Sequence, residues 1–456
     1  MLFEQLFNKD HLSEYFLKHL INRNGGGRDR MTPRQYWERV HIEEDLNCII
    51  NKCNNQSYEF SPYREILITK SRYKNPRCIS IPTVRDRLVL GVLNEYLQEV
   101  FTEAVNHNTP NQLIQNVKVY ISLNKGEGIR FFKSDFSQFY DNIRQSLLIS
   151  KLRERIDDER IISLISKAIQ TPTIPLGKSR KSVEESFIGV PQGLAISNIL
   201  SFIYMLDTDE LFSTLGADIY IRYVDDILML NPHFDSMRDI LIDYLREEKM
   251  GITLSPEKTL SGSLPNGSLD FLGFVLHKDV VSIRKSSIDR QLQRIANLCA
   301  ELRKMIQDPA SRPKLIDSEE ELVAYYVELL NETISGIRFD SRMYGWLPYF
   351  QVSNDLQVFF RMDKVVRKMT QKVEQLSSFH IHSFVKTYYD IIENSGKKYL
   401  IDYDAISDTP KRKAFLVRRG AINKDSQVTN EHIDQLFQNY CNNRRKSMEK
   451  NIGYFR

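Results

Sequence analysis

The chain has 456 residues, of which 41% are hydrophobic and 27% charged, and these proportions are ordinary for a globular protein with a substantial core. Its 63 basic and 59 acidic residues leave a net charge of only +4, so overall charge is weak evidence for a nucleic-acid partner. No apolar run approaches the roughly 18–20 residues that a membrane span requires, and the first ten residues lack the layout of a signal peptide. Five scattered cysteines without a Cys-x-x-Cys pair predict free thiols in a reducing cytoplasm and argue against a zinc site.

Residues 1–60 have helical patterns with polar connectors, including a glycine-rich loop at 24–33 ahead of a helix expected over 35–53. Helices are also predicted over 87–101 and 234–247. Strand patterns recur along the chain at 65–69, 77–81, 128–134, 219–230 and 269–276. Mixed helices and strands, with the acidic residues of interest on strands, predict an α+β fold in which helices back an antiparallel sheet.

One segment of the N-terminal half is strongly basic. Residues 61–90 hold seven Lys or Arg and two acidic residues, a local net charge of +5. Such a block is most often a solvated face, but its overlap with the motif at 70–87 that is described below favours contact with nucleic acid.

Tyr223, Val224, Asp225 and Asp226 form the most informative motif. They interrupt a run of β-branched, aromatic and aliphatic residues over 219–230, which favours a buried β-hairpin. Two carboxylates in such a place are costly unless a cation neutralises them, and oxygen ligands suit Mg²⁺. A surface turn with Asx hydrogen bonds is the alternative, and these four residues leave both readings open.

Two upstream segments favour the metal-binding interpretation. Asp135 follows the apolar pair Phe131 and Phe132, as a carboxylate at the end of a strand would. Residues 189–198 open with two glycines and a proline and lead into a helical apolar pattern, which is typical of a loop that feeds a helix N-terminus. The order along the chain is therefore a carboxylate, a glycine-rich loop with Gln192, and the paired aspartates.

This order resembles the palm motifs of reverse transcriptases. The resemblance extends over most of the first 275 residues: 70–87 is similar to the fingers segment of bacterial enzymes, and 251–259 to the motif that carries a lysine beside the active site. The resemblance implies a right-hand polymerase fold with fingers, palm and thumb, followed by a helical C-terminal extension. It also implies a hairpin that grips the primer end, formed by Phe271, Leu272, Gly273 and Phe274.

The resemblance further implies two-metal phosphoryl transfer. Asp135 and Asp225 would bridge two Mg²⁺ ions, with Mn²⁺ as the alternative, while Asp226 assists and the carbonyl of Phe136 completes one shell. Lys258 matches the lysine that protonates the departing pyrophosphate, although a solvated loop lysine is the alternative.

Five residues are expected to hold the nucleotide. Lys70 and Arg77 match fingers positions that clamp the triphosphate, and Gln192 and Gly193 would pack against the nucleotide and template base. Tyr140 would collide with a ribose 2′-hydroxyl and so select deoxynucleotides. RNA-dependent RNA polymerases usually have an acidic residue at that spacing, so the expected product is DNA.

The chain is expected to divide into four segments: N-terminal helices and fingers (1–134), palm (135–280), thumb (281–340) and a helical extension (341–456). From 286 onward apolar residues recur every three or four positions, with basic residues on the other face. Contact with RNA and plain helix surface are about equally favoured for the basic patches of the extension, and the RNA-binding residues predicted there are Lys411, Arg412, Lys413, Arg418 and Arg419. His380 and His382 alternate on what should be a helix, so they lack the spacing of helical metal ligands.

Among short bacterial reverse transcriptases, the chain lacks the motifs expected of retron enzymes and the nuclease tail of many intron enzymes. Ser197 is followed by Asn198 and not by the proline common in intron enzymes, which resembles the defence-associated ("unknown group" or abortive-infection) group. The predicted role is antiphage defence in the bacterial cytoplasm with a noncoding RNA as template or scaffold, dNTPs and a DNA product. A second copy or a second defence protein are the expected protein partners. The alternatives are a retron-type or intron-like enzyme and an inactive RNA-binding scaffold.

Overall fold

The computed structural model describes most of the chain, and all structural statements refer to that part. The described residues are 2–23, 25–39, 41–69, 76–105, 109–124, 128–177, 186–214, 218–230, 234–246, 250–264, 267–316, 318–425 and 427–452. Within them, no helix combines the length and apolar character needed to cross a membrane.

The chain folds as two compact units. The first unit comprises 1–107 and 130–262, and the second comprises 108–129 and 263–456. The predicted boundary between thumb and extension, at 340/341, falls inside the second unit, between two paired strands of one sheet. Each unit is described by itself.

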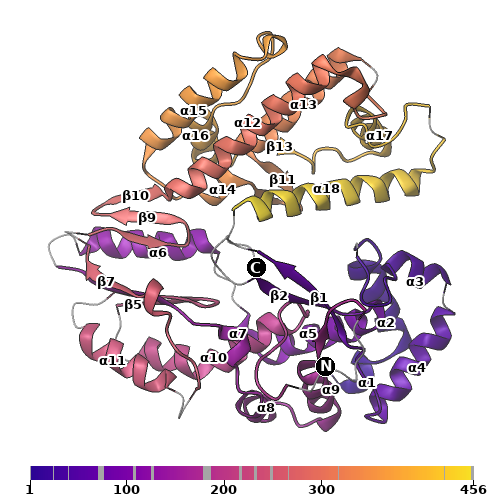
Figure 1. Cartoon of the computed structure of the whole chain (residues 1–456), viewed down its shortest axis with the longest axis vertical. Helices are drawn as coiled ribbons and strands as arrows, with labels where there is room; N and C mark the ends of the chain where they lie inside the picture. Colours follow the sequence, from indigo (N-terminus) through magenta and orange to yellow (C-terminus); the bar gives the residue numbers. More distant parts are fainter. Residues whose placement is uncertain are drawn as a thin grey trace. The chain divides into compact units, whose positions relative to one another are not determined.

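The first unit contains helices around two sheets (Figure 1). Its helices are α1 (Phe3–Leu6), α2 (Lys9–Tyr15), the π-helix η1 (Phe16–Leu20), α3 (Pro33–Arg39), α4 (Ile42–Asn54), α5 (Val84–Val100), η2 (Thr102–Ala104), α7 (Phe139–Asn142), α8 (Gln145–Arg153), α9 (Glu159–Gln170), α10 (Ser197–Thr214), α11 (Phe234–Leu245) and η4 (Pro256–Lys258). Its strands are β1 (Tyr63–Ile68), β2 (Arg77–Ile81), β3 (Arg130–Asp135), β4 (Thr173–Ile174), β5 (Ile219–Tyr223), β6 (Asp226–Leu230) and β7 (Leu260–Ser263). The helix expected over 35–53 is two helices, α3 and α4.

The central sheet of the first unit has the strand order β5-β6-β3-β7. β6 is buried at four consecutive positions, 227–230, as expected for an inner strand covered on both faces. The antiparallel pairs β5–β6 and β3–β6 confirm the predicted strands at 128–134 and 219–230 and the antiparallel sheet. The long apolar helix α10 contributes buried side chains to the same hydrophobic core as this sheet.

The smaller sheet of the first unit has the order β2-β1-β4, with β1–β2 antiparallel and β1–β4 parallel. Thr83 caps α5, which follows β2 directly, by accepting a hydrogen bond from the Asp86 amide. The buried Asp86 carboxylate in turn accepts from the hydroxyls of Tyr58 (2.9 Å) and Thr83 (2.7 Å). These contacts fix the strand that carries Arg77 relative to the helices.

The second unit is mainly helical, with two small sheets (Figure 1). Its helices are α6 (Pro110–Leu123), α12 (Lys285–Gln307), η5 (Pro309–Ser311), α13 (Glu319–Ser335), α14 (Trp346–Tyr349), α15 (Leu356–Thr370), η6 (Glu374–Leu376), α16 (Phe384–Asn394), α17 (Thr409–Arg418) and α18 (Asn430–Ile452). Its strands are β8 (Leu269–Phe271), β9 (Phe274–His277), β10 (Val280–Ile283), β11 (Ile337–Phe339), β12 (Arg342–Tyr344) and β13 (Ile401–Asp402), in sheets β10-β9-β8 and β12-β11-β13.

A buried ionic network ties the C-terminal helices to α13. Glu332 is fully buried and pairs with Arg419 and, at 2.5 Å, with Arg444, while the Tyr403 hydroxyl donates to it at 2.7 Å. Burial alone would raise the pKa of Glu332, but the two guanidinium groups outweigh it and lower that pKa. The segments predicted as thumb and extension therefore share one core.

The two histidines at 380 and 382 do not lie on a helix, contrary to the sequence prediction. They precede α16, in the connection after η6. His382 Nδ1 lies 2.9 Å from the Ser335 hydroxyl, which itself donates to the Asn331 carbonyl at 2.6 Å. His382 therefore has a structural partner.

Candidate active site

The antiparallel register of the central sheet brings two carboxylates together. Asp135, the last residue of β3, is the direct cross-strand partner of Asp226, the first residue of β6. Directly opposed residues of an antiparallel pair have Cβ atoms about 4.5–5.5 Å apart and point to the same face. Asp225 precedes Asp226 in the hairpin turn and is also buried. The fold thus gathers the three aspartates that the sequence predicted as catalytic.

The turn that carries Asp225 has unusual backbone geometry. β5 and β6 are joined by two residues, Val224 and Asp225, and Val224 has φ 60°. Two-residue hairpin turns require positive φ and usually use glycine or asparagine there, whereas a β-branched residue is strained by about 1–2 kcal/mol. The Phe136 amide donates to the Asp225 carbonyl at 2.9 Å, which joins this turn to the end of β3.

Arg222 holds the same turn from inside the protein. Its Nη1 donates to the Val224 carbonyl at 3.0 Å, and its Nε and Nη2 contact the Asp209 carboxylate on α10. The Tyr220 hydroxyl donates to Asp209 at 2.8 Å. Although burial disfavours the guanidinium, Asp209 outweighs it and raises the pKa of Arg222, so Arg222 stays charged. Sequence reasoning missed this network, because Arg222 and Asp209 are 13 positions apart.

Lys258 lies inside the site. It ends η4, and its Nζ forms an ion pair with Asp135 Oδ2. Backbone hydrogen bonds place this segment: the Ser255 amide donates to the Asp135 carbonyl at 2.7 Å, and the Lys258 amide to the Ser255 carbonyl at 3.1 Å. The structure therefore brings Lys258 together with Asp135, one of the residues that the sequence predicted as catalytic.

The carboxylates fit a divalent metal completed by substrate. Asp135 is 3% exposed, and among the described residues its Oδ1 has no hydrogen-bond partner, a costly state for a buried carboxylate oxygen. In the described part of the chain no group of three or more His, Cys, Asp or Glu side chains is arranged so that it could hold a metal ion by itself. Mg²⁺ normally takes one or two carboxylates and fills its shell with water and phosphate oxygens, so this donor set fits it.

A second group of predicted residues gathers around Asp141. Its side chain hydrogen-bonds with that of Gln192 and lies near the charge of Arg77; burial nevertheless raises the pKa of the Asp141 carboxyl. The Ser80 amide donates to the Gln192 carbonyl at 2.7 Å. Gly193 has φ 108°, and a Cβ there would lie 2.8 Å from Ile79 Cγ2 and 2.9 Å from the Ser80 carbonyl oxygen, so only glycine fits.

Asp141 was not predicted, although it directly follows Tyr140 in the sequence. Lys70, the other predicted triphosphate contact, lies outside the described residues. Of the predicted nucleotide site, the structure thus describes the side formed by Arg77 and Gln192.

Tyr140 is buried, with 8% of its surface exposed, and its hydroxyl has a defined partner. That hydroxyl donates to Asn198 Oδ1 on α10 at 2.8 Å, and the Val190 amide donates to the Tyr140 carbonyl at 2.8 Å. The residue that sequence reasoning used only to distinguish subgroups, Asn198, therefore holds the predicted sugar gate. This contact could not be read from the sequence because 58 positions separate the two residues.

The predicted primer-gripping hairpin belongs to the second unit. β8 and β9 are joined by Leu272 (φ 48°) and Gly273 (φ 85°), a two-residue turn with both positions at positive φ. Phe271, Leu272 and Phe274 are buried, and the Tyr349 hydroxyl donates to the Leu272 carbonyl at 3.0 Å. Gly273 is buried as well, and its carbonyl accepts from the Arg284 amide at 2.9 Å, so contact of this hairpin with a primer stays a prediction.

Most of the predicted RNA-binding cations are engaged within the protein. Lys411 pairs with Asp408 at 2.7 Å, Arg412 with Asp434 at 2.9 Å and Arg418 with Glu328 at 2.6 Å, while Lys413 is half-buried and also has an interaction. The side chain of Arg419 is 0% exposed and pairs with Glu328 and Glu332. The prediction for Arg419 is wrong in this structure, because a fully buried guanidinium cannot contact RNA.

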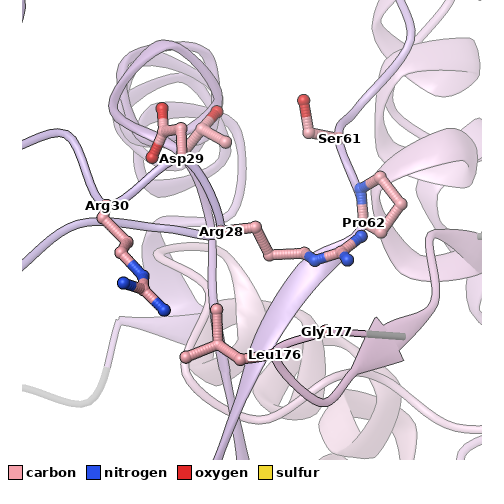
Figure 2. Close-up of a pocket in the computed structure, with 8 residues that line it drawn as sticks. Arg28, Asp29, Arg30, Ser61, Pro62, Leu176 and Gly177 are labelled. Atoms are coloured by element: carbon pink, nitrogen blue, oxygen red, sulfur yellow. The ribbon is translucent and has the colours of Figure 1, made fainter. Parts of the chain in front are cut away.

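A cavity of about 460 Å³ lies elsewhere in the first unit (Figure 2). It is lined by the loop of Arg28, Asp29 and Arg30 and by residues from three other segments, namely Ser61, Pro62, Thr83, Leu176 and Gly177. Figure 2 shows Arg28 reaching across toward Pro62, whereas Arg30 points to another side. None of the predicted catalytic residues lines this cavity.

Comparisons with known proteins agree with this geometry. Residues 68–276 match the family model described as reverse transcriptase (RNA-dependent DNA polymerase). Over 178 residues, 38% of this chain and 21% of the relative, the chain is 29% identical to an uncharacterized 91 kDa protein in a cob intron of Schizosaccharomyces pombe. Over 172 residues it is 27% identical to the group II intron-encoded protein LtrA of Lactococcus lactis, covering 37% of this chain and 28% of LtrA.

The matches thus span less than a third of these two relatives' length. Among solved structures, a Candida albicans telomerase in complex with a telomeric RNA fragment is similar over 87% of this chain and 66% of that chain, with 13% identity and a TM-score of 0.44. The family match covers Asp135, Gln192, the paired aspartates and Lys258. The segment that resembles the reverse transcriptase family model, residues 68–276, is somewhat less than half of this chain.

Proposed function

We propose that this protein is an RNA-directed DNA polymerase that adds deoxynucleotides to a primer 3′ end. The observation that supports this most is the pairing of Asp135 with Asp226 across β3 and β6, with Asp225 beside them and one buried Asp135 oxygen without a partner. In-line phosphoryl transfer asks the protein for positioning and charge neutralisation, which rigid paired strands supply.

Asp135, Asp225 and Asp226 would hold two Mg²⁺ ions, or Mn²⁺ as the alternative, with the carbonyl of Phe136. Bound there, the ions would neutralise charge on the attacking 3′ oxygen and on the leaving pyrophosphate. Lys258, whose ammonium lies against Asp135, is suited to protonate the pyrophosphate as it departs.

The remaining residues would position the substrates. Arg77 and Lys70 would contact the triphosphate, since a guanidinium donates two hydrogen bonds to phosphate oxygens. Gln192 and Gly193 would face the nucleotide and template base, and Tyr140 would exclude a 2′-hydroxyl. The hairpin at 271–274 would contact the primer end.

Primer extension on an RNA template tests this proposal. Asp226→Asn keeps the size of the side chain but removes its charge, so incorporation of dNTPs in Mg²⁺ should fall by at least 100-fold. Asp239→Asn is the matched control, because Asp239 lies on the surface of α11 and its ion pair among the described residues is with Arg238. Equal activity of both variants would refute the assigned site.

The biological role is a separate proposal: antiphage defence in a bacterial cytoplasm with a noncoding RNA. Asn198 in place of the proline common in intron enzymes supports it, as does the long helical region after the polymerase motifs. An intron-like enzyme is the second candidate, because both relatives are named as intron proteins. Sequencing the RNA and DNA that copurify with the protein separates them: intron boundaries would favour the second candidate, and another recurrent RNA the first.

A further inference from the structure

One helix of the second unit presents a basic face to solvent. Residues 356–372, which comprise α15 and the two residues after it, contain five basic side chains and one acidic side chain, a balance of 5 − 1 = +4. The net charge of the whole chain is also +4, so this segment holds as much excess charge as the entire protein. The basic residues are Arg361, Lys364, Arg367, Lys368 and Lys372.

The single acidic residue does not neutralise this face. The Asp363 carboxylate caps α16, where it accepts hydrogen bonds from the Ser383 hydroxyl at 2.6 Å and the Phe384 amide at 2.7 Å. Within the described ranges of the chain, no ion pair joins any of the five basic side chains to an acidic residue, and the one side-chain bond among them runs from Arg361 to Gln357. The five charges therefore remain available to an external anion.

This arrangement contrasts with the basic cluster of α17, where acidic residues of the same unit pair with Lys411, Arg412 and Arg418. Two helices with similar basic content thus differ in how much of their charge is free to act outside the molecule. If the basic residues of α15 served only to keep the helix soluble, nearby acidic residues could pair with them as they do on α17.

The spacing on α15 makes the face continuous. Phe359, Met362 and Val366 are buried and point inward. Arg361, Lys364 and Lys368 follow at intervals of three and four residues, so they lie on one side of the helix and extend along about 10 Å of its axis. Three charges spread along the helix in this way suit the successive phosphates of a nucleic-acid strand better than they suit a single small anion.

An exposed aromatic residue adjoins the basic face. Phe360 is 59% exposed although it is large and apolar. α16, which packs beside α15 (Figure 1), exposes Tyr389 and Ile392. Basic side chains that track phosphates, combined with aromatic side chains on which bases stack, are the features of a surface that binds single-stranded nucleic acid.

We propose that the α15 face binds a single-stranded segment of RNA, with phosphates on Arg361, Lys364 and Lys368 and a base against Phe360. The surface lies outside the reverse transcriptase domain, so it would retain RNA independently of the template strand in the polymerase site. The choice of RNA over DNA rests on the proposed function, since the polymerase would copy RNA.

The test measures binding of a labelled, unstructured RNA oligonucleotide to the full chain across a salt titration. Changing Arg361, Lys364 and Lys368 to Gln should reduce the slope of log K against log [salt] by about 2, because each phosphate contact with a single strand contributes about 0.7. The matched control changes Lys411, Lys413 and Arg418 to Gln, and its slope should fall by less than half as much.

Phe360→Ala should weaken RNA binding about tenfold and leave the salt slope unchanged, since stacking adds no counterion release. The proposal is overturned if the α15 triple variant keeps the wild-type slope, if the α17 control loses as much, or if unlabelled DNA of the same sequence competes better than RNA.

Extension of a short exogenous template–primer should be unchanged in the α15 variant, because the three aspartates are intact. Loss of RNA retention with normal extension supports the surface. The wild-type chain could also fail to extend any primer while the α15 variant, unlike the wild type and the α17 control, loses RNA binding. In that case the proposed polymerase function fails and the RNA surface stands.

Discussion

Replacement of Arg222 by Lys tests how the turn of Val224 and Asp225 is held. The Arg222 side chain is 3% exposed, pairs with Asp209 through two nitrogens and donates to the Val224 carbonyl at 3.0 Å. A lysine keeps one charge but cannot make all three contacts, because it lacks the planar fork. Loss of one charged hydrogen bond from a buried group should lower the free energy of unfolding by about 1.5–3 kcal/mol.

The effect on catalysis follows from the strain at Val224. Its φ of 60° costs about 1–2 kcal/mol, and the Arg222 hydrogen bond holds it there. Released from this contact, Val224 should relax and shift Asp225, so kcat for dNTP incorporation should fall roughly 10- to 30-fold. Glycine adopts positive φ without this cost, so adding Val224→Gly to Arg222→Lys should recover most of the lost kcat.

The assay combines steady-state primer extension with denaturant unfolding of the same four proteins, wild type, both single variants and the double variant. The control is Arg153→Lys, since Arg153 makes an equally bidentate pair with Glu159 (3.0 and 2.9 Å) but on the surface, and it should change neither quantity. The reasoning is refuted if Arg222→Lys retains full kcat, or if Val224→Gly restores none of the loss.

Three further predictions concern the gate, the nucleotide loop and pH. Tyr140→Ala should lower the ratio of dNTP to NTP efficiency by removing the clash with a 2′-hydroxyl, and Asn198→Ala should lower it less by freeing the ring; an unchanged ratio in Tyr140→Ala would make that residue a core aromatic. Gly193→Ala should raise KM for dNTPs at least tenfold, because its Cβ would lie 2.8 Å from a β2 side chain, and a wild-type KM would contradict this. Burial lowers the pKa of His382 to about 4, whereas the imidazole of the unfolded chain has its ordinary pKa of about 6.5. Protonation below pH 6.5 therefore favours the unfolded chain, so the free energy of unfolding should be full above about pH 6.5 and decline as pH falls toward 4. His382→Gln should flatten the urea-midpoint profile in that window, and an unaltered profile would show that other groups cause it.

The strands that carry the three predicted catalytic aspartates could be predicted because their signals are local. The run of β-branched, aromatic and aliphatic residues on either side of Asp225 and Asp226 predicts a hairpin, and the apolar pair before Asp135 predicts a strand end. The hairpin is formed by β5 and β6, and the strand that ends at Asp135 is β3, which pairs with β6. The sequence could not show which residue opposes which, since register depends on the partner strand.

What supports the site could not be predicted, because its contacts join distant positions. Asp209 reads as an ordinary polar residue of a helix until β5 brings Arg222 against it. Asn198 likewise has no local signal for its bond to Tyr140.

The RNA-binding prediction failed at Arg419 for the same physical reason. A dense run of basic residues suggests an exposed patch, but Glu328 and Glu332 of α13 neutralise Arg419 in the core. The basic residues of α15 are spaced at helical intervals and so form no conspicuous run, and their lack of acidic partners in the described part of the chain emerges only from the fold.

Incorporation of dTTP on poly(rA)/oligo(dT) is the most direct test of the central claim that the opposed aspartates catalyse RNA-templated DNA synthesis. The purified chain should incorporate dTTP in Mg²⁺, lose the activity in EDTA, and lose it when Asp225 and Asp226 are both replaced by Ala while the far-UV circular dichroism stays that of the wild type. Incorporation by the well-folded double variant at the wild-type rate, or none by the wild-type chain with either Mg²⁺ or Mn²⁺, would contradict it.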